Sequence, residues 1–318
     1  MSRVFEALAK AGEEKHGQVQ RPVVEIESPM LTPRAGEGEK PAPEQHFVPT
    51  GTVSGMNGKV HETHESYSKV IDGEKSWRDK IEEWLLGWDL RRYNSYPIIA
   101  LEKESPGSEQ YKILREQIKR LRVESGIRNF SITSPVKRDG KTTIAVNLAA
   151  ALSLDYEEQV LLIDGDLRAP SIHRYFNAVQ SPGLTDYLGS DSETDLKSLV
   201  QETFLPGLRI LPAGRPSHLA SELLAKERMN NITEKARTEF PGHHIIIDSP
   251  PVLATPDPLI IARYVDAVLV VVRAGKTPRD YLMKALQSLN STKVMGVVLN
   301  GADLGMASKY YYYSANRA

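Results

Sequence analysis

A glycine, a lysine and two threonines stand in a row at residues 140–143, directly before an apolar stretch of helical character. Backbone N–H groups at the start of a helix, together with the helix dipole, bind phosphate. A lysine placed there reaches the terminal phosphates of a nucleotide, and a threonine hydroxyl can ligate Mg²⁺. We therefore predict a phosphate site with Lys141 as its catalytic cation and Thr142 as a metal ligand. The predicted nucleotide-binding residues are Asp139, Gly140, Lys141, Thr142 and Thr143.

The loop in front of the lysine departs from the usual glycine-rich pattern of such sites, GxxxxGK[ST]. Pro135 stands where the first glycine would be, and the loop continues with Lys137 and Arg138. Taken alone, the Gly-Lys-Thr tripeptide is also consistent with a chance turn before a helix. The interpretation as a phosphate site therefore depends on further groups elsewhere in the chain.

Three aspartates follow apolar runs of strand length: Asp164 and Asp166 after VLLI, and Asp248 after HIII. Residues two apart on an extended backbone point to the same face, so Asp164 and Asp166 could face one metal or one nucleophile. We interpret this pair as catalytic carboxylates that accept the proton of an attacking hydroxyl. Asp164 and Asp248 are the predicted Mg²⁺ ligands, because Mg²⁺ binds few protein carboxylates and keeps several waters. The alternative is that all three only cap turns after strands.

An α/β fold is needed to bring these groups together. From residue 108 to 305, short apolar runs alternate with amphipathic helical stretches, as in a parallel sheet with crossover helices. The runs lack alternation, which is typical of strands covered by helices on both faces. We predict a doubly wound, mostly parallel sheet whose carboxyl edge carries the site. The expected strands are 129–133, 160–163, 208–211, 244–247, 267–272 and 294–299.

The first third of the chain has a different composition. Residues 1–17 could form a short helix, and residues 18–66 are rich in Pro, Gly, Glu, Ser and Thr, which predicts a disordered linker. Residues 67–107 are predicted as an amphipathic helical segment and connection, in which Ile81, Trp84, Leu85 and Trp88 share one helical stripe. This stripe could pack on the following domain, or it could dock on a partner protein or a membrane surface.

Composition excludes several classes of protein. The formal net charge of -1 provides no field that would attract nucleic acid, and we expect no nucleic-acid partner. The absence of cysteine excludes disulfides, thiolate metal sites and cysteine nucleophiles. No apolar run reaches the roughly 18 residues of a membrane-spanning helix, and acidic residues near the start are unlike a secretory signal. The chain is therefore expected to have no transmembrane segment and to remain in the cytoplasm.

With these motifs together, the chain resembles the bacterial tyrosine kinases of capsule and exopolysaccharide biosynthesis from Glu109 onward. The likeness includes DLRAPSIHRYF at 166–176, GLTDYLGS at 183–190 and LPAGRPSHLASELL at 211–224, and it continues through DAVLVVVRAGKTPRD and GVVLNGAD. The resemblance implies a P-loop domain of the deviant Walker A type that binds ATP and Mg²⁺. It implies that Asp164 and Asp166 form the second Walker pair and that Asp248 is the Walker B acid.

Four consecutive tyrosines, Tyr310, Tyr311, Tyr312 and Tyr313, lie in the predicted tail at 306–318. They cannot all be buried on one face of a strand or helix. The resemblance implies that this cluster is the phosphoacceptor, that the tail of one copy enters the active site of a neighbour, and that phosphorylation loosens a ring-shaped homo-oligomer by charge repulsion. The alternatives are an aromatic tail without function or a strand that adds to a sheet edge.

A second element bears on the same oligomer. Glu109, Lys112 and Arg115 resemble the interface motif of the family, a glutamate followed by basic residues at i+3 and i+6. Lysine lacks the bidentate fork of arginine, so a salt bridge through Lys112 would be weaker or differently oriented. The alternative is an ordinary solvated helix face.

Two other functions remain open. A partition-type ATPase would carry a signature lysine five residues before Lys141, where this chain has Val136. A non-catalytic nucleotide-binding regulator of a polysaccharide assembly complex would keep the fold without the chemistry. For a kinase and for a regulator alike, the resemblance implies that a separate membrane-embedded protein, a co-polymerase or activator, is the partner. The partner would recruit the chain to the inner face of the cell membrane, with residues 1–106 as candidate docking elements.

Overall fold

The computed structural model describes residues 96–102, 105–155, 158–190, 195–289 and 293–302, and the backbone of residues 23–26. All of these belong to one compact unit, whereas a second unit, residues 31–89, lies outside the described residues. The predicted helix at 1–17, the tryptophan stripe and the four consecutive tyrosines also lie outside them. The predicted domain boundaries in these regions stay predictions.

A single twisted sheet forms the centre of the described unit, with the strand order β1-β8-β7-β2-β6-β3-β5-β4. Neighbouring strands are parallel, except that β4 runs antiparallel to β5. All six predicted strands are present, which confirms the predicted fold class. Their bounds are β2 Asn129–Thr133, β3 Val160–Asp164, β5 Leu208–Leu211, β6 His244–Asp248, β7 Ala267–Arg273 and β8 Val294–Asn300.

Two edge strands were not predicted: β1 (Val23–Ile26) and β4 (Gln201–Glu202). β1 pairs in parallel with β8, so the structure differs here from the linker predicted over 18–66. The segment reads VVEI, whose β-branched residues favour strands, and the edge of β8 offers unpaired backbone groups that a short strand can bond. The strand preference of these four residues does not show in the average composition of residues 18–66, on which the prediction of a linker is based.

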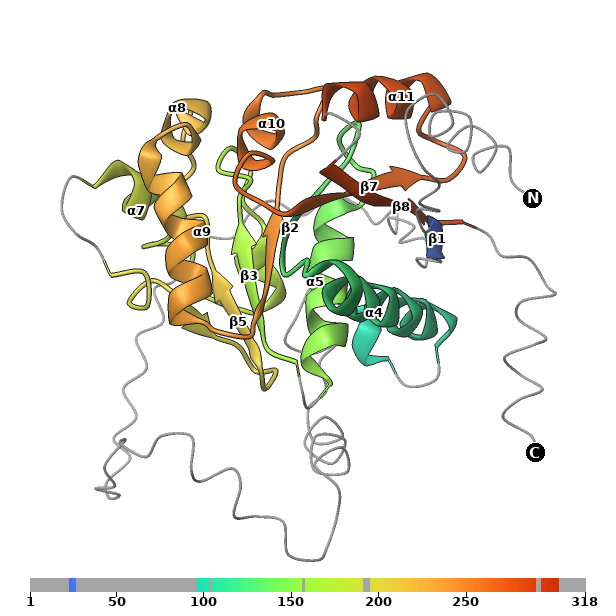
Figure 1. The fold of residues 1–318 in the computed structure, drawn as a ribbon, viewed down its shortest axis with the longest axis horizontal. Coiled ribbons are helices and arrows are strands. Elements are labelled where there is room, and N and C mark those ends of the chain that lie inside the picture. Colours follow the sequence, from blue (N-terminus) through green and yellow to red (C-terminus); the bar gives the residue numbers. More distant parts are fainter. Residues whose placement is uncertain are drawn as a thin grey trace, which may run out of the picture. The chain divides into compact units, whose positions relative to one another are not determined.

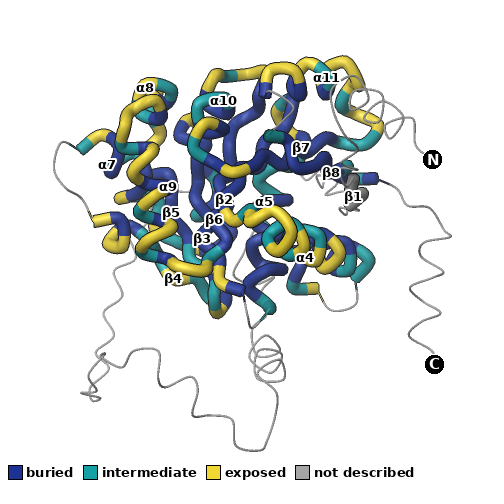
Figure 2. Tube along the Cα trace, in the orientation of Figure 1, coloured by how far each residue is buried: buried dark blue, intermediate teal, exposed yellow. Residues whose placement is uncertain are grey.

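Helices cover both faces of the sheet (Figure 1). On one face, α4, α5, α6 and the 3-10 helix η1 pack on a core that includes Phe130 and Leu162. On the other, α7 to α11 pack on a core that includes Leu161 and Ile247. The strands between them are almost entirely buried (Figure 2). The helix bounds are η1 Ile99–Leu101, α4 Pro106–Ser125, α5 Lys141–Ser153, α6 Ile172–Tyr175, α7 Leu184–Gly189, α8 Ala220–Leu224, α9 Glu227–Glu239, α10 Asp257–Ile261 and α11 Arg279–Ser288.

The helix α4 has clear signals at both ends. Ser105 caps its N-terminus by accepting a hydrogen bond from the N–H of Ser108, and Pro106 occupies its first turn. Gly126 ends it with a left-handed φ of 68°. The helix therefore starts two residues before the predicted boundary at 108.

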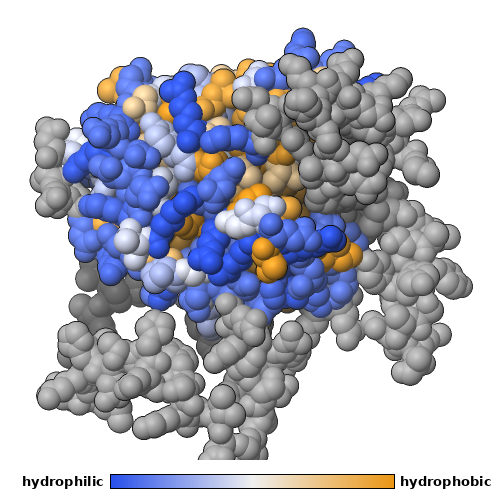
Figure 3. All heavy atoms as spheres, viewed as in Figure 1, coloured by the Kyte–Doolittle hydropathy of each residue, from blue (hydrophilic) through white to orange (hydrophobic). Residues whose placement is uncertain are grey.

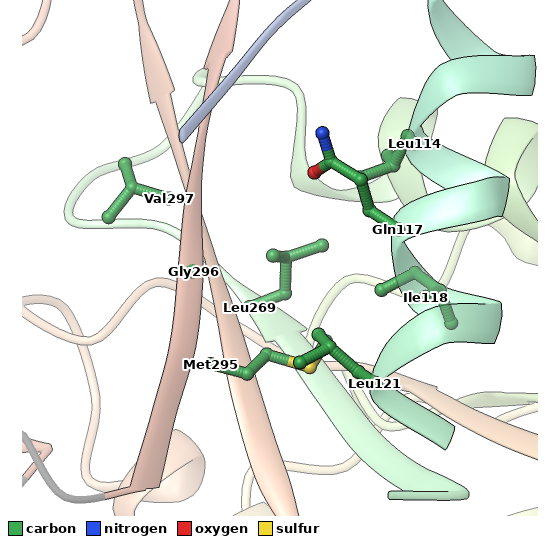
Figure 4. A pocket seen from close by; sticks show the side chains of 8 residues that line it. All are labelled: Leu114, Gln117, Ile118, Leu121, Leu269, Met295, Gly296 and Val297. Atoms are coloured by element: carbon green, nitrogen blue, oxygen red, sulfur yellow. The ribbon is translucent and has the colours of Figure 1, made fainter. Parts of the chain in front are cut away.

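A small groove separates α4 from the strands β7 and β8. Figure 3 shows apolar side chains in this part of the surface, bordered by hydrophilic ones. Figure 4 shows how Gln117 and its neighbours on the helix face the strands across the groove. The lining residues are Leu114, Gln117, Ile118, Leu121, Leu269, Met295, Gly296 and Val297. The groove thus lies between one face of α4 and two interior strands of the sheet.

Among the residues that the structure describes, no helix combines the length and the apolar character required to cross a bilayer.

Candidate active site

Three adjacent strands deliver the predicted site residues to one edge of the sheet. The loop 134–140 follows β2 and leads into α5, and β6 and β3 are the next strands in the sheet. Asp164 ends β3, Asp248 ends β6, and the two residues are paired in the register of these strands. The carboxyl ends of parallel strands meet at the same edge, so residues far apart in the chain become neighbours.

Lys141 and Thr142, the first two residues of α5, both contact Asp248, and Lys141 also contacts Asp166. The Lys141 ammonium lies 3.1 Å from Asp166 Oδ2 and 3.8 Å from Asp248 Oδ1. Thr142 Oγ1 donates a hydrogen bond of 2.6 Å to Asp248 Oδ2. The structure therefore brings together a cation, a hydroxyl and carboxylates at the N-terminus of a helix.

Asp164 has a different set of contacts from Asp166. Its Oδ2 accepts hydrogen bonds from the N–H groups of Ser171 and Ile172, both at 3.0 Å, and its Oδ1 accepts one from the Asp166 N–H at 3.2 Å. β3 ends at Asp164, so the alternation of an extended strand does not continue to Asp166. In this structure Asp166 contacts Lys141, whereas Asp164 also organises the loop that leads into α6.

Burial changes the protonation of these groups. Burial raises the pKa of Asp164 to about 7, and the nearby Asp248 adds to the effect. Burial also raises the pKa of Asp248 to about 6, although Lys141 and the Thr142 hydroxyl oppose the rise. For Lys141, burial lowers the pKa, but Asp248 and Asp166 more than compensate, so its pKa is raised and the side chain stays charged. The single positive charge of Lys141 therefore does not balance the carboxylates of Asp164, Asp166 and Asp248 when all three are ionised.

The donor set fits Mg²⁺. Asp248 Oδ1 is buried, and its nearest cation is the Lys141 ammonium at 3.8 Å, beyond ordinary hydrogen-bond distance, so this oxygen can accept a further ligand. Hydroxyl and carboxylate oxygens are the ligands that Mg²⁺ prefers, and it commonly takes one or two carboxylates plus phosphate and water. Within the described ranges, no group of three or more His, Cys, Asp or Glu side chains forms a metal centre of another kind. The structure brings Thr142 and Asp248 together for such an ion, whereas both oxygens of Asp164 accept backbone hydrogen bonds. The predicted set of metal ligands, Thr142, Asp164 and Asp248, stays a prediction.

The loop at 134–140, which is predicted to bind phosphate, has two residues with positive φ. Gly140, the N-cap of α5, has φ 96°, and no side chain caps the helix there, which leaves first-turn N–H groups available for an anion. Arg138 has φ 70°, a left-handed conformation that is uncommon for a residue with a side chain. The loop thus has at Arg138 the backbone geometry that glycine adopts most easily.

Replacing Arg138 by glycine is expected to raise the free energy of unfolding by about 1 kcal/mol, because it removes left-handed strain of that order. Urea unfolding at neutral pH measures the change. The neighbouring Lys137, whose φ is negative, provides the matched control. Lys137→Gly should lower the stability by about 0.5–1 kcal/mol through the greater chain entropy of glycine. A loss of stability in both variants would show that Arg138 is held by contacts that outweigh its strain.

The remaining predicted residues have local partners. Thr143 Oγ1 lies 3.5 Å from the Tyr175 hydroxyl. The Asp139 carboxylate is buried and accepts hydrogen bonds from the Thr277 hydroxyl and the Val136 N–H, and its predicted part in nucleotide binding stays a prediction. Glu109 and Lys112 form an ion pair with each other at 2.5 Å on the surface of α4. Arg115 pairs with Glu116 and points a second donor to the Ala151 carbonyl.

Sequence reasoning missed two residues that contact the loop, Thr277 and Asn300. Thr277 Oγ1 donates a hydrogen bond of 2.6 Å to Asp139 Oδ1, and Asn300 Nδ2 donates one of 2.8 Å to the Asp139 carbonyl. A signal for Asn300 was present, because it is a polar residue at the end of an apolar run, as Asp164 and Asp248 are. It lies at the same carboxyl edge of the sheet.

The parallel sheet, the loop between β2 and α5, and the lysine with its strand-end carboxylates define the class of P-loop nucleotide-binding proteins. No family model matches the chain. The chain is 33% identical over 219 residues to Tyrosine-protein kinase YwqD of Bacillus subtilis, which covers 68% of this chain and 90% of that protein. It belongs to the bacterial tyrosine-protein kinases.

Other relatives agree. Over 215 residues the chain is 34% identical to Tyrosine-protein kinase ptk of Acinetobacter johnsonii, of which it spans only 28%. The kinase domain of the Escherichia coli tyrosine kinase ETK superposes with a TM-score of 0.60 at 27% identity, over 70% of this chain and 89% of that one. The chimerical protein CapA2B2 superposes with a TM-score of 0.59 at 29% identity, over 65% and 90%. The chain thus spans most of some relatives and less than a third of others.

Proposed function

We propose that this chain transfers the γ-phosphoryl group of Mg-ATP to tyrosine hydroxyls, chiefly Tyr310 to Tyr313 of another copy. The observation that supports it is the partly buried cluster of Lys141, Thr142, Asp166 and Asp248 at the N-terminus of α5. Membership of a kinase family supplies the reaction type, and the cluster supplies the groups that the reaction needs. The tyrosines themselves lie outside the described residues.

Each residue has a proposed role that its contacts allow. The N–H groups of residues 140–143 and the Lys141 ammonium bind the phosphates and stabilise charge on the transferred group. Thr142, Asp164 and Asp248 would hold Mg²⁺, which would supply positive charge against the phosphate oxygens. Asp166 is the carboxylate best placed to accept the phenol proton, because it is slightly exposed and contacts Lys141.

The cellular role follows from the family resemblance. The chain would regulate the polymerisation and export of capsule or exopolysaccharide from the cytoplasmic side, recruited by a membrane-embedded co-polymerase or activator. Glu109, Lys112 and Arg115 would lie in the contact between copies of a ring. Because Glu109 and Lys112 already pair within one chain, that ion pair would open or be shared when a second copy binds.

The proposed reaction is tested with the purified chain and Mg-[γ-³²P]ATP, alone and with membranes of the producing organism. The wild-type chain should acquire phosphotyrosine, and a variant with all four tail tyrosines changed to phenylalanine should lose most of it. An epitope-tagged Lys141→Ala chain should become labelled only when active chain is added, which demonstrates transfer between copies. ATP hydrolysis without phosphotyrosine would instead support a partition-type ATPase. Binding of ATP without turnover would support a non-catalytic regulator.

A further inference from the structure

The phosphate-binding loop is held from the side by residues of β7, β8 and the turn between β7 and α11. Asp139 is only 3% exposed although it carries a carboxylate. Its Oδ1 accepts a hydrogen bond from the Thr277 hydroxyl at 2.6 Å, and its Oδ2 accepts one from the Val136 N–H at 3.3 Å. The carboxylate therefore joins the start of the loop to a turn 138 residues further along the chain.

Thr277 is itself fixed by both of its hydrogen-bonding functions. Its hydroxyl oxygen accepts a hydrogen bond from the Arg273 N–H at 3.2 Å while it donates to Asp139. The Thr277 N–H bonds the Arg273 carbonyl at 3.0 Å. The turn after β7 thus presents this hydroxyl in one orientation, directed at the loop.

Asn300, the last residue of β8, holds the other end of the loop. It is 2% exposed, and its Nδ2 donates to the Asp139 carbonyl at 2.8 Å. The backbone carbonyl of Asn300 accepts a hydrogen bond of 2.9 Å from the N–H of Ala274, which directly follows β7. The ends of β7 and β8 are thus bonded to each other. A Cβ atom at Gly140 would lie 2.0 Å from Asn300 Nδ2, so only glycine permits this approach.

We propose that Asp139, Thr277 and Asn300 form a loop clamp, a set of positioning residues that hold the backbone of residues 136–140 in its phosphate-binding conformation. This inference rests on the proposed nucleotide site. The loop has Pro135 at the place where the usual pattern has glycine, and its Arg138 is in a left-handed conformation. The local sequence alone therefore does not favour the observed backbone conformation. Contacts from outside the loop must select that shape. None of the three side chains needs to touch the nucleotide to affect how it binds.

The clamp acts by preorganisation. Backbone N–H groups bind phosphate well only when they converge before the ligand arrives, since ordering them during binding lowers the affinity. Without the Thr277 hydroxyl, the Asp139 carboxylate loses a donor and the loop can turn away from the site. Loss of the clamp should therefore weaken nucleotide binding and raise the KM for ATP. It should lower kcat, the rate at saturating ATP, by a smaller factor.

The test measures the affinity of the purified full chain for Mg-ATP by isothermal titration calorimetry, with thermal unfolding of every variant as the check of folding. Thr277→Val removes the hydroxyl with little change of shape, and Thr277→Ser keeps it. Asn300→Asp replaces the donor to the Asp139 carbonyl by an acceptor. Thr185→Val is the matched control, because the Thr185 hydroxyl also donates a hydrogen bond of 2.6 Å, in its case to the Ala213 carbonyl.

We expect Thr277→Val and Asn300→Asp to bind Mg-ATP about tenfold more weakly or worse, as follows from misplacement of binding groups. Thr277→Ser should bind within about threefold of wild type, and Thr185→Val should bind as wild type does. Folded Thr277→Val that binds with wild-type affinity, or Thr277→Ser that binds as weakly as the valine variant, would overturn the clamp. A wild-type chain that binds no Mg-ATP would instead refute the proposed nucleotide site and this inference with it.

Discussion

Lys141→Ala is expected to lower the rate of tyrosine phosphorylation by about 10³-fold or more, the size of effect seen when a charge-stabilising group is removed from a transferring phosphoryl group. The Lys141 ammonium is the only cation that contacts Asp166 and Asp248 among the described residues. Its loss removes the positive charge nearest the predicted phosphate position. Phosphotyrosine formation at saturating Mg-ATP, followed over time, measures the rate.

The control for this prediction is Lys119→Ala. Lys119 also forms an ion pair, with Asp155 at 2.6 Å, but on the surface between α4 and the end of α5. It should keep a rate within about threefold of wild type, since an ion pair of this kind contributes little. A Lys141→Ala chain that is folded and retains more than a tenth of the wild-type rate would exclude the proposed role of the lysine.

Asp164→Asn is expected to stabilise the ligand-free protein at pH 8 by about 1–3 kcal/mol while it abolishes phosphoryl transfer. The pKa of Asp164 in the folded protein is raised to about 7, above the ordinary value of 3.8. The folded state therefore binds this proton more tightly, and the resulting stability is complete below pH 4 and lost as the pH rises through 7. At pH 8 the wild-type protein contains a buried charge that asparagine lacks.

The expected gain is smaller than the pKa shift alone would give. An asparagine amide can accept the two hydrogen bonds from Ser171 and Ile172, but its NH₂ group would then face the N–H of Asp166. Such a conflict between two donors costs about 1–3 kcal/mol. Stability is thus exchanged for function at this residue, as is common in active sites.

Urea unfolding of both chains at pH 5, 6, 7 and 8 tests this prediction. The difference between the two chains is the informative quantity, because other groups also titrate. His244, for example, has its pKa lowered to about 3 by burial, so it stabilises the fold as the pH rises towards 6.5 in both chains. The advantage of Asp164→Asn should grow from pH 5 to pH 8. Asp195→Asn, at an exposed residue, is the control and should change the free energy of unfolding only slightly.

Much of the fold could be predicted from local signals. The runs NFSIT, VLLID and AVLVVV are apolar without alternation, so a buried parallel strand is the structure that satisfies them wherever they pair. Lys141 and Thr142 follow a loop and begin a helix, a relation that depends on neighbouring residues alone. The aspartates at 164 and 248 end such strands, and the geometry of parallel sheets then requires them to share an edge.

Tertiary structure decided the rest, because it depends on contacts between residues far apart in the chain. Nothing near Asp166 shows that it, and not Asp164, contacts Lys141, since β3 ends between them and the loop takes its own course. The pairing of β1 with the edge of β8 is equally invisible in a segment of linker composition. Such contacts depend on packing and hydrogen bonding throughout the whole fold, so they cannot be predicted from a local sequence pattern.

The sequence by itself determined the nature of the site, a lysine and threonine at a helix start with carboxylates at strand ends. Only the folded chain decided what holds that site in shape. The hydrogen bonds of Asp139 with Thr277 and Asn300 span 138 and 161 residues. They exist because the order of strands places β7 next to β2 and β8 next to β7, so that residues at and after their carboxyl ends reach the loop that follows β2.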